Sequence, residues 1–325
     1  MTGENAWATM IGALQSEFIK VGNVQSISSV SQAVQLAIRE LTPLLALELQ
    51  FNGGIHYAPY NMYSESNPNP GGSVSTENTV SVLAGLRMLS TIASANPTFY
   101  DPTVVANINS LMNAATRYLK SSYSPSLGYF RQGGTYDYRD GSWTWADTFA
   151  SDCQTWAITV LGVEVVDAWF GAGASKSIWQ VTKDISGYNC NAATGYCDGI
   201  GFSDNVQEQV FSGEWTLGGV SMLRTFAAYY SSKGNSAEYF EAISEADHMF
   251  AQVKAQLSSS FTYPDGIQAT GILYANKRYY IPFGWWANPL PSVASTGWAV
   301  MLESNYNPFV LGGGALPSPY WNTNV

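Results

Sequence analysis

The stretch TENTVSVLAGLRMLSTIASA, residues 76–95, sets the fold class, because small and apolar side chains fall on nearly every side of it. Three further stretches share this character: residues 147–161, 211–230 and 293–304. A helix without a polar face is buried on all sides. The sequence therefore predicts several helices that lie in the interior of the molecule.

Two other stretches, residues 103–122 and 236–258, have one apolar stripe and one polar face. Their apolar side chains recur three or four residues apart, which is the spacing of an amphipathic helix. The stripes consist of Val104, Ile108, Leu111, Met112, Ala115 and Leu119, and of Phe240, Ile243, Ala246, Phe250, Val253 and Leu257. We expect these helices to pack with one face against the interior.

Three more segments complete the helical pattern. Residues 164–184 continue the half-exposed set, with a break at the glycines around 171–173. Residues 5–20 form another helix, and residues 28–50 form one that is kinked or interrupted at Pro43, because proline removes a helical hydrogen bond.

Buried and half-exposed helices therefore alternate along the chain. This alternation predicts an all-α fold, an α/α toroid of five or six helical hairpins, in which an inner ring of helices is wrapped by an outer ring. A solenoid of helix pairs is the alternative, although its repeats are shorter and more regular. No linker rich in Pro and Ser divides the sequence, so residues 1–325 are interpreted as one catalytic domain.

Four long segments rich in Gly, Tyr, Trp, Asn and Asp precede the buried helices: residues 51–75, 124–146, 186–210 and 260–292. Long loops on a rigid scaffold commonly carry binding sites. We expect them to gather at one end of the toroid, with short strands around 127–131 and 271–281.

Composition excludes several classes of function. Charged residues make up 12% of the chain and the formal net charge is −10. Nucleic-acid binding requires a basic surface, and anionic membranes attract basic segments, so neither partner is expected. The composition, poor in charge and rich in aromatic residues, is typical of carbohydrate-binding proteins. We expect the protein to be secreted or periplasmic, with its signal peptide already removed, and to be a monomer. A cytoplasmic location is the alternative.

Cysteine and histidine are scarce. Cys190 and Cys197 flank a short loop and either close a local disulfide or stay reduced, whereas Cys153 is expected to be a buried thiol. The chain has only two histidines, His56 and His248, and no cluster with metal-ligand spacing, so no metal site is expected. No phosphate-binding loop or dinucleotide fingerprint is present, so no cofactor is expected either.

Three of the buried helices open with a carboxylate just after a Ser or Thr that is expected to cap the helix: Glu77, Asp152 and Glu214. Acids in a first helical turn interact favourably with the helix dipole, which is the purely structural interpretation. If the inner helices begin at one mouth, however, the three carboxylates meet in one cavity. Such a cluster drives their pKa values apart, as acid/base hydrolysis of a glycosidic bond requires.

Aromatic side chains concentrate in the long loops rather than in the helices. Flat rings at a loop-lined mouth offer platforms for the apolar faces of sugars. The candidate substrate-binding residues are Trp143, Trp145, Tyr136, Asp204, Tyr280, Trp285, Trp286 and His56. Packing within the loops is the alternative role for each ring.

These residues resemble the six-hairpin (α/α-toroid) glycosidase superfamily, and two short pieces are similar to family 8 glycoside hydrolases. There, a Thr/Ser-Glu-Gly-x-Ser-Tyr segment opens an inner helix and supplies the general acid. Thr76-Glu77-Asn78 resembles it, with Asn in place of Gly and without the Tyr, and Ser151-Asp152-Cys153 resembles the start of another helix of that family. The resemblance implies the toroid fold and a saccharide substrate.

The sequence thus predicts a glycoside hydrolase, of the inverting kind, acting on a neutral or mildly cationic polysaccharide or oligosaccharide. Glu77 is expected to be the general acid and Asp152 the base that activates water. Glu214 is expected to bind sugar hydroxyls or to exchange roles with Asp152. The alternatives are a polysaccharide lyase on the same toroid, with a Tyr or His base, and a non-catalytic glycan-binding protein.

Overall fold

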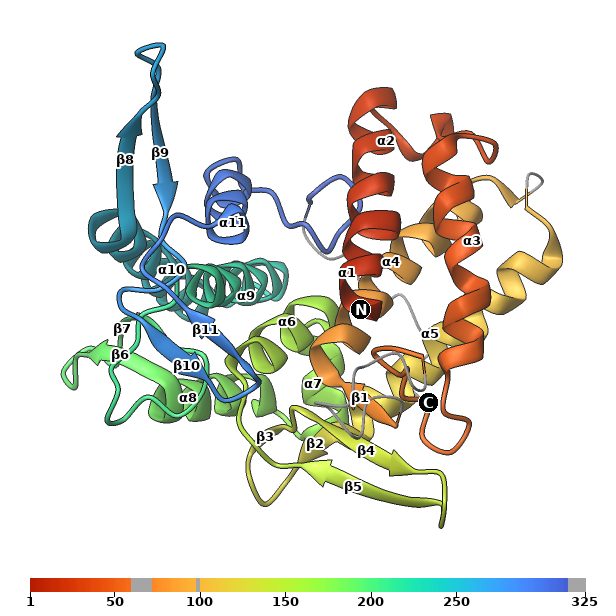
Figure 1. The fold of residues 1–325 in the computed structure, drawn as a ribbon, viewed down its shortest axis with the longest axis horizontal. Coiled ribbons are helices and arrows are strands. Elements are labelled where there is room, and N and C mark those ends of the chain that lie inside the picture. Colours follow the sequence, from red (N-terminus) through yellow and green to blue (C-terminus); the bar gives the residue numbers. More distant parts are fainter. Residues whose placement is uncertain (60–71, 98–99, 315–325) are drawn as a thin grey trace. The chain divides into compact units, whose positions relative to one another are not determined.

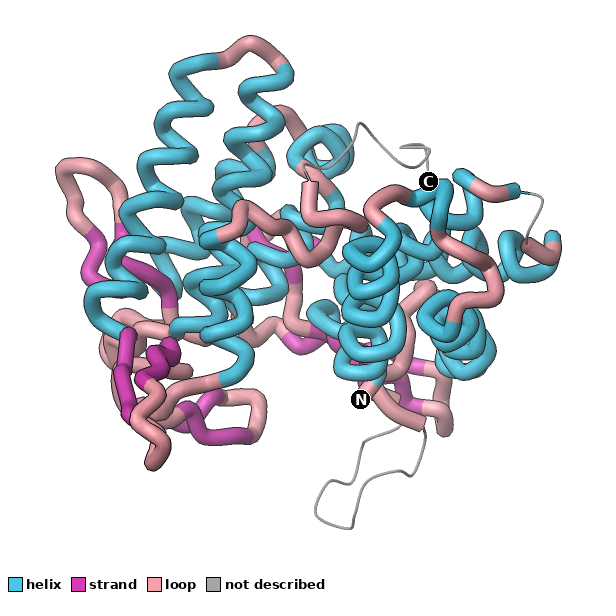
Figure 2. The backbone as a smooth tube through the Cα atoms, turned by 90° about the horizontal axis from the view of Figure 1, so that it is seen from above, coloured by secondary structure: helices cyan, strands magenta, loops and turns pink. Residues whose placement is uncertain are grey.

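The computed structural model describes residues 1–59, 72–97 and 100–314, so part of the predicted loop 51–75 lies outside the described residues. The chain forms two compact units, Met1–Thr148 with the segment from Pro308, and Phe149–Asn307. In each unit, helices make up most of the backbone and the strands are short (Figure 1, Figure 2). Among the described helices, none is long and apolar enough to cross a membrane.

The first unit begins with a nearly continuous helical run. An α-helical turn α1 (Thr2–Asn5), a π-helical segment η1 (Ala6–Gly12) and α2 (Ala13–Val21) follow one another, which agrees with the helix predicted over residues 5–20. After a short 3₁₀ turn, η2 (Val24–Ser26), α3 (Gln32–Leu47) begins at the N-cap Ser31. It continues through Pro43 as one helix.

The core of this unit is α4 (Thr76–Ala95), whose side chains are buried on all sides, as its sequence predicts. It packs against α5 (Pro102–Ser122), which buries only one stripe, including Ile108, Leu111 and Leu119. Asp101 caps α5, because its side chain accepts a hydrogen bond from the Thr103 backbone N–H.

A three-stranded antiparallel sheet leads into α4. Its strands are β1 (Ser73–Ser75), β4 (Gly133–Asp137) and β5 (Ser142–Ala146), in the order β1-β4-β5. β1 ends at Ser75, which is also the N-cap of α4. The sheet therefore fixes the position at which α4 begins. A separate small hairpin joins β2 (Tyr123–Ser124) to β3 (Tyr129–Phe130).

The second unit has α9 (Gly213–Ser232) as its central helix, buried on nearly all sides. α9 packs against α6 (Ser151–Leu161), α10 (Ser236–Leu257) and α11 (Val293–Glu303). α7 (Val163–Phe170) and α8 (Ala174–Ser186) complete the helices and are separated at Gly171, as predicted.

Three hairpins of two strands each account for most of the long loops in this unit. β6 (Gly187–Cys190) pairs with β7 (Cys197–Ile200), and the Cys190–Cys197 disulfide joins them. β8 (Ser258–Thr262) pairs with β9 (Gln268–Ile272), and β10 (Tyr279–Ile281) pairs with β11 (Trp285–Ala287). Cys153 is a buried free thiol, as expected.

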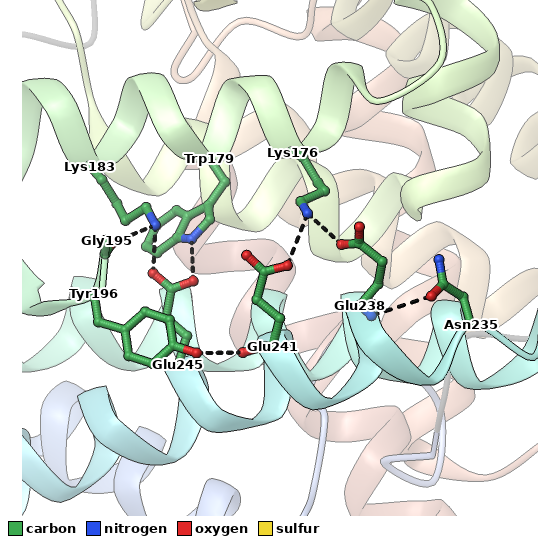
Figure 3. A network of polar contacts seen from close by, with 9 residues as sticks. All are labelled: Lys176, Trp179, Lys183, Gly195, Tyr196, Asn235, Glu238, Glu241 and Glu245. Carbon is green, nitrogen blue, oxygen red and sulfur yellow. Dashed lines mark hydrogen bonds and ion pairs between the residues drawn. The ribbon is translucent and has the colours of Figure 1, made fainter. Parts of the chain in front are cut away.

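A polar network holds α8 against α10 (Figure 3). Lys183 Nζ lies 2.8 Å from Glu245 Oε1, and both side chains are almost fully buried. Trp179 donates its indole N–H to the same carboxylate over 3.2 Å. Lys183 also donates to the Gly195 carbonyl between β6 and β7, so the network joins the disulfide hairpin to α8 and α10.

Three details of the helix predictions are wrong. α11 is not buried all round, because Val293 and Val300 are 93% and 62% exposed. Phe240, placed on the buried stripe of α10, is 64% exposed, because α10 turns its first residues toward solvent. Ser151 does not cap α6, since the N-cap is Ala150 and the Ser151 hydroxyl donates instead to the Gly201 carbonyl over 2.8 Å.

Candidate active site

Asp152 and Glu214 lie at the starts of two neighbouring helices of the second unit, α6 and α9. Asp152 is buried, and its Oδ1 accepts the Cys153 backbone N–H over 2.7 Å. Glu214 is half-buried. Both are in the first turn of their helices, where the dipole favours a negative charge.

One short segment, residues 200–202, fixes both helix starts. The Ile200 carbonyl accepts the Ser212 backbone N–H over 3.0 Å and the Thr216 hydroxyl over 3.1 Å, at the first turn of α9. The Phe202 carbonyl accepts the Ser151 backbone N–H over 3.1 Å, at the first turn of α6. The two carboxylates are therefore held on a common backbone support.

Burial and the neighbouring charge act together on Asp152. Burial raises its pKa, backbone hydrogen bonding to Cys153 lowers it, and the charge of Glu214 raises it further, so that the pKa is about 7. A carboxyl in this state is protonated in mildly acidic solution and can donate a proton, whereas ordinary aspartates are ionised there.

Tyr274 stands beside both carboxylates. Burial, then the charge of Glu214, raises the pKa of its phenol, and Asp152 adds to the shift. Its backbone carbonyl accepts the Gly213 N–H over 3.0 Å, so it is fixed to the start of α9. Its hydroxyl accepts the indole N–H of Trp285 over 3.3 Å. The phenol therefore links the carboxylates to the hairpin β10–β11.

Aromatic side chains pack around Tyr274. Buried Phe202 and Trp215 contact edge to face, with ring centroids 4.8 Å apart. Phe283 stacks against Trp215, and Tyr279 lies parallel to Phe202. Acidic groups next to flat rings are a suitable environment for a sugar ring.

The predicted platform residues of hairpin β10–β11 are exposed, as a sugar platform requires. Tyr280, Trp285 and Trp286 are 51%, 42% and 51% exposed. Tyr280 is opposite Trp286 in the strand register, and the Arg278 guanidinium lies 4.2 Å from the centroid of the Trp286 ring. Asp204 is exposed and accepts the Val206 backbone N–H, which is the geometry of a turn former.

Glu77 opens α4 in the first unit and is half-buried. Its carboxylate accepts hydrogen bonds from the Asn78 side chain over 2.7 Å and from the Ser81 hydroxyl over 3.1 Å. The Asn78 side chain in turn accepts the Gly3 backbone N–H over 2.6 Å. Asn78, the residue that departs from the family 8 pattern, therefore orients the acid and anchors the N-terminus.

His56 lies next to β1, just before α4. Its Nε2 is 2.6 Å from the Tyr138 hydroxyl, and its Nδ1 is 3.4 Å from the Ser73 carbonyl. Burial lowers the pKa of His56, which keeps the ring neutral near pH 7. Tyr136 contacts Tyr138 edge to face, with centroids 4.9 Å apart.

Trp143 and Trp145 contact each other edge to face on β5, with centroids 5.1 Å apart. Trp143 packs so closely over Gly134 that a Cβ atom there would clash with the indole ring. The Trp143 indole N–H is buried and has no hydrogen-bond acceptor among the described residues. An unsatisfied buried donor is unfavourable, and a ligand hydroxyl is one group that can satisfy it.

The predicted residues thus fall into two groups. Asp152, Glu214 and Trp285 lie around Tyr274 in the second unit, whereas Tyr280 and Trp286 lie on the other face of hairpin β10–β11. Glu77, His56, Tyr136, Trp143 and Trp145 lie around the sheet β1-β4-β5 in the first unit. The convergence of Glu77 with the other two carboxylates stays a prediction.

Sequence reasoning missed Tyr274 and Thr216. Tyr274 lies in an uncharacteristic stretch, GILYAN, and no motif distinguishes it from the other tyrosines. Its role depends on the backbone contact with Gly213, which joins residues far apart in the sequence. Thr216 looks like one more small residue of a buried helix, and only the pairing with Ile200 gives it a function.

Three of the solved structures to which this chain is similar are the following. One is UGL with dGlcA-Glc-Rha-Glc, at TM-score 0.55 and 12% identity over 91% of this chain and 75% of that one. The second is the unsaturated glucuronyl hydrolase of Bacillus sp. GL1, described as responsible for the degradation of glycosaminoglycan, at TM-score 0.54 and 12% identity over 89% and 71%. The third is the unsaturated glucuronyl hydrolase of Streptococcus agalactiae, at TM-score 0.52 and 11% identity over 91% and 69%.

These likenesses decide the fold. The chain has the α/α-toroid fold. The toroid confirms the fold class predicted from the alternation of helices. No family model matches the sequence, and no curated protein matches it either.

Proposed function

We propose that this toroid is a glycoside hydrolase that cleaves a polysaccharide or oligosaccharide by carboxylate acid/base catalysis. The observation that carries the proposal is the pair Asp152 and Glu214, because one buried carboxyl has its pKa raised to about 7 beside a second one. Two carboxyl groups in different protonation states are what hydrolysis of a glycosidic bond needs. The names of the structural neighbours support the same class of reaction.

In this proposal, Asp152 is the general acid, which revises the role given to it from sequence. Its proton goes to the glycosidic oxygen as the bond to the anomeric carbon breaks. Glu214, ionised, removes a proton from the attacking water or stabilises the positive charge at the anomeric carbon. Glu77 stays a predicted further acid of the enzyme.

We propose that the reaction inverts the configuration at the anomeric carbon, which is also the outcome expected from the sequence. An inverting enzyme uses its second carboxylate as a base that activates water, whereas a retaining enzyme uses it as a nucleophile. Proton NMR of the first product released distinguishes the two anomers. Release of the anomer with the configuration of the substrate would assign a retaining mechanism instead.

The aromatic residues supply binding in both units. In the second unit, Trp285 lies against Tyr274, and Tyr280 and Trp286 offer exposed rings on the other face of hairpin β10–β11. In the first unit, Trp143 offers a half-buried ring. Sugars bind such sites through apolar C–H faces and through hydroxyls that pair with nearby polar groups.

A second candidate substrate is an oligosaccharide that ends in an unsaturated uronyl group, the kind of group in the neighbours' names. Arg278 favours it, because a guanidinium beside the exposed Trp286 can pair with a sugar carboxylate. The acidic pair Asp152 and Glu214 favours a neutral sugar at the point of cleavage. Replacing Arg278 with Gln should weaken turnover of the uronyl substrate alone.

The activity is tested by incubating the purified chain with neutral polysaccharides, their oligosaccharides and unsaturated uronyl oligosaccharides. New reducing ends from the neutral substrates support the proposal. Loss of the ultraviolet absorbance of the uronyl substrates identifies the second candidate. A gain of that absorbance from a uronate polymer identifies a lyase, and binding without any product identifies a glycan-binding protein.

The same proposal includes a secreted or periplasmic location. The Cys190–Cys197 disulfide supports it, because disulfides persist mainly in oxidising compartments. Fractionation of the source cells, with detection of the chain by antibody, tests this part.

A further inference from the structure

The hairpin β8–β9, residues 258–272, is called the arm here. Figure 1 shows it extending away from α10, the helix that precedes it. Nearly all of its residues from 260 to 270 are exposed. A hairpin of two strands is only marginally stable by itself in water, so an arm of this kind needs either a firm base or a binding role.

The two faces of the arm have different chemistry. Phe261 and Tyr263 lie two residues apart and therefore on the same face, and their rings contact edge to face with centroids 5.2 Å apart. Phe261 pairs with Ala269 across the hairpin, and Ser259 pairs with Gly271. Phe261 thus stands next to a small residue, whereas Tyr263 lies opposite Ile267, which is itself 60% exposed. Phe261 is 40% exposed and Tyr263 is 50% exposed.

The opposite face carries hydroxyl and amide groups. Ser260 and Thr270 pair across the strands, with their hydroxyl oxygens 3.0 Å apart, and Thr262 pairs with Gln268. The only formal charge between residues 258 and 272 is Asp265, which accepts the Ile267 backbone N–H in the turn. The two strands of the arm are therefore uncharged, aromatic on one face and rich in hydroxyls on the other, and the single charge lies in the turn.

The base of the arm is attached to the candidate active site. The Ile272 backbone N–H donates to the Thr296 hydroxyl over 2.9 Å at the start of α11. Two residues later, Tyr274 is hydrogen-bonded to the start of α9 and lies beside Glu214. The two rings are level with Ile267 and Ala269, roughly 20 Å of extended strand away from Tyr274. A polymer that leaves the site along β9 would meet the rings of the arm.

We propose that the arm binds a neutral polysaccharide chain at a distance from the point of cleavage. The choice of ligand rests on the proposed function. Exposed rings on one face suit a sugar polymer, because its apolar C–H faces can stack on them. A second copy of this chain is the competing occupant, but a formal net charge of −10 makes contact between copies repulsive. A neutral polymer meets no such repulsion.

The test uses the full chain in an Asp152→Asn background, so that the polysaccharide is not degraded during measurement. Affinity electrophoresis in gels that contain xylan, mannan or β-glucan measures binding. Replacing both Phe261 and Tyr263 with Ala should weaken binding to at least one polymer by about tenfold. The variant Tyr263→Phe keeps the ring and should bind as the unaltered arm does. Phe240→Ala removes an exposed ring from α10 and serves as the matched control.

Equal retardation of the arm variant and its parent on every polymer would overturn the proposal, as would an equal loss in Phe240→Ala. The proposal would also be overturned if no polymer retarded the parent chain. A change of sedimentation coefficient on removing the two rings would overturn it as well, because it would assign the arm to self-association. Turnover of short oligosaccharides, measured with Asp152 restored, should be the same with and without the rings. If no substrate is turned over, the proposed function fails, while the binding result for the arm still stands.

Discussion

Asp152 combines three properties that a merely helix-stabilising acid does not need. It is buried, it lies beside a second carboxylate, and its pKa is raised to about 7. An acid placed only to interact with the helix dipole gains about 0.3–1 kcal/mol and is best left exposed and ionised. The burial of Asp152 therefore lowers stability at neutral pH, and a catalytic role explains why such a residue is kept there.

This burial predicts how stability depends on pH. The pKa of Asp152 is raised from 3.8 in the unfolded chain to about 7, so the folded state holds a proton that the unfolded state has released. The stabilisation is complete below pH 4 and is lost as the pH rises through 7. The whole effect is on the order of 4 kcal/mol.

The variant Asp152→Asn has no carboxyl at this position, so it should not lose stability in this way as the pH rises. Its stability relative to the parent chain should therefore increase between pH 4 and pH 8, as measured by urea unfolding at both values. The exposed Asp204→Asn is the control and should show little change. An offset for Asp152→Asn that is equal at both pH values would show that its carboxyl is not perturbed in the fold.

Glu77 gives a second test at the residue scale. Its carboxylate accepts two side-chain hydrogen bonds, so Glu77→Gln keeps the shape but changes the acceptor. If Glu77 acts only at the helix start, the variant should lose about 0.3–1 kcal/mol of stability with turnover nearly unchanged. If it takes part in catalysis, turnover should fall by about 100-fold or more. Thermal unfolding together with initial rates separates the two outcomes, and we expect the second.

The residue scale also shows what a sequence can reveal. Asp152 and Glu214 were found because both follow a Ser-containing helix start, a local pattern. Which of the two is the acid and which the base cannot be derived from that pattern, because the roles proposed here depend on burial and on each other's charge. Tyr274 and Thr216 were missed, because their contacts join separate segments of the chain.

At the scale of elements, segment 200–202 determines how α6 and α9 present their carboxylates. Thr216 is fully buried, and its hydroxyl accepts the Ile200 N–H over 3.0 Å. Thr216→Val would leave this N–H without its partner, which costs about 1–3 kcal/mol. We expect a lower melting temperature and a lower kcat. Thr216→Ser keeps the hydroxyl and should restore kcat, and a valine variant with unchanged kcat would refute the positioning role.

The buried ion pair between α8 and α10 makes a further prediction about elements. Removing one partner leaves an uncompensated buried charge, so Glu245→Ala should cost about 3–5 kcal/mol. The double variant Lys183→Met with Glu245→Leu should recover much of this loss, because a well-packed apolar pair needs no compensation. Equal destabilisation in the single and double variants would contradict it. Denaturant unfolding measures both.

The burial of a helix could be predicted from its sequence where its apolar pattern was strong, but not where it depends on which elements pack against that helix. α4 and α9 are buried all round, as their sequences indicate. α11 has an equally apolar sequence, yet Val293 and Val300 are exposed, because burial depends on neighbours that the helix itself does not encode. The strands of the long loops were only partly foreseen, since their pairing joins segments that are distant in sequence.

At the scale of the whole molecule, the alternation of buried and half-exposed helices was enough to predict the toroid. The fold is shared with chains of 11–12% identity, so the pattern of burial survives where individual residues do not. Substrate and chemistry depend on a few side chains instead, and these are proposals that rest on the second unit. The convergence of Glu77 with Asp152 and Glu214 stays a prediction, because Glu77 belongs to the first unit and the other two carboxylates to the second.

The central claim, that Asp152 donates the proton in glycoside hydrolysis, is tested most directly by the release of reducing ends from a neutral oligosaccharide. The unaltered chain and Asp152→Asn are compared between pH 5 and pH 8. We predict that the unaltered chain releases products at a rate that falls as the pH rises through about 7, and that the variant is slower by about 100-fold or more at pH 5, with its fold intact. Equal rates for the two chains would contradict the claim.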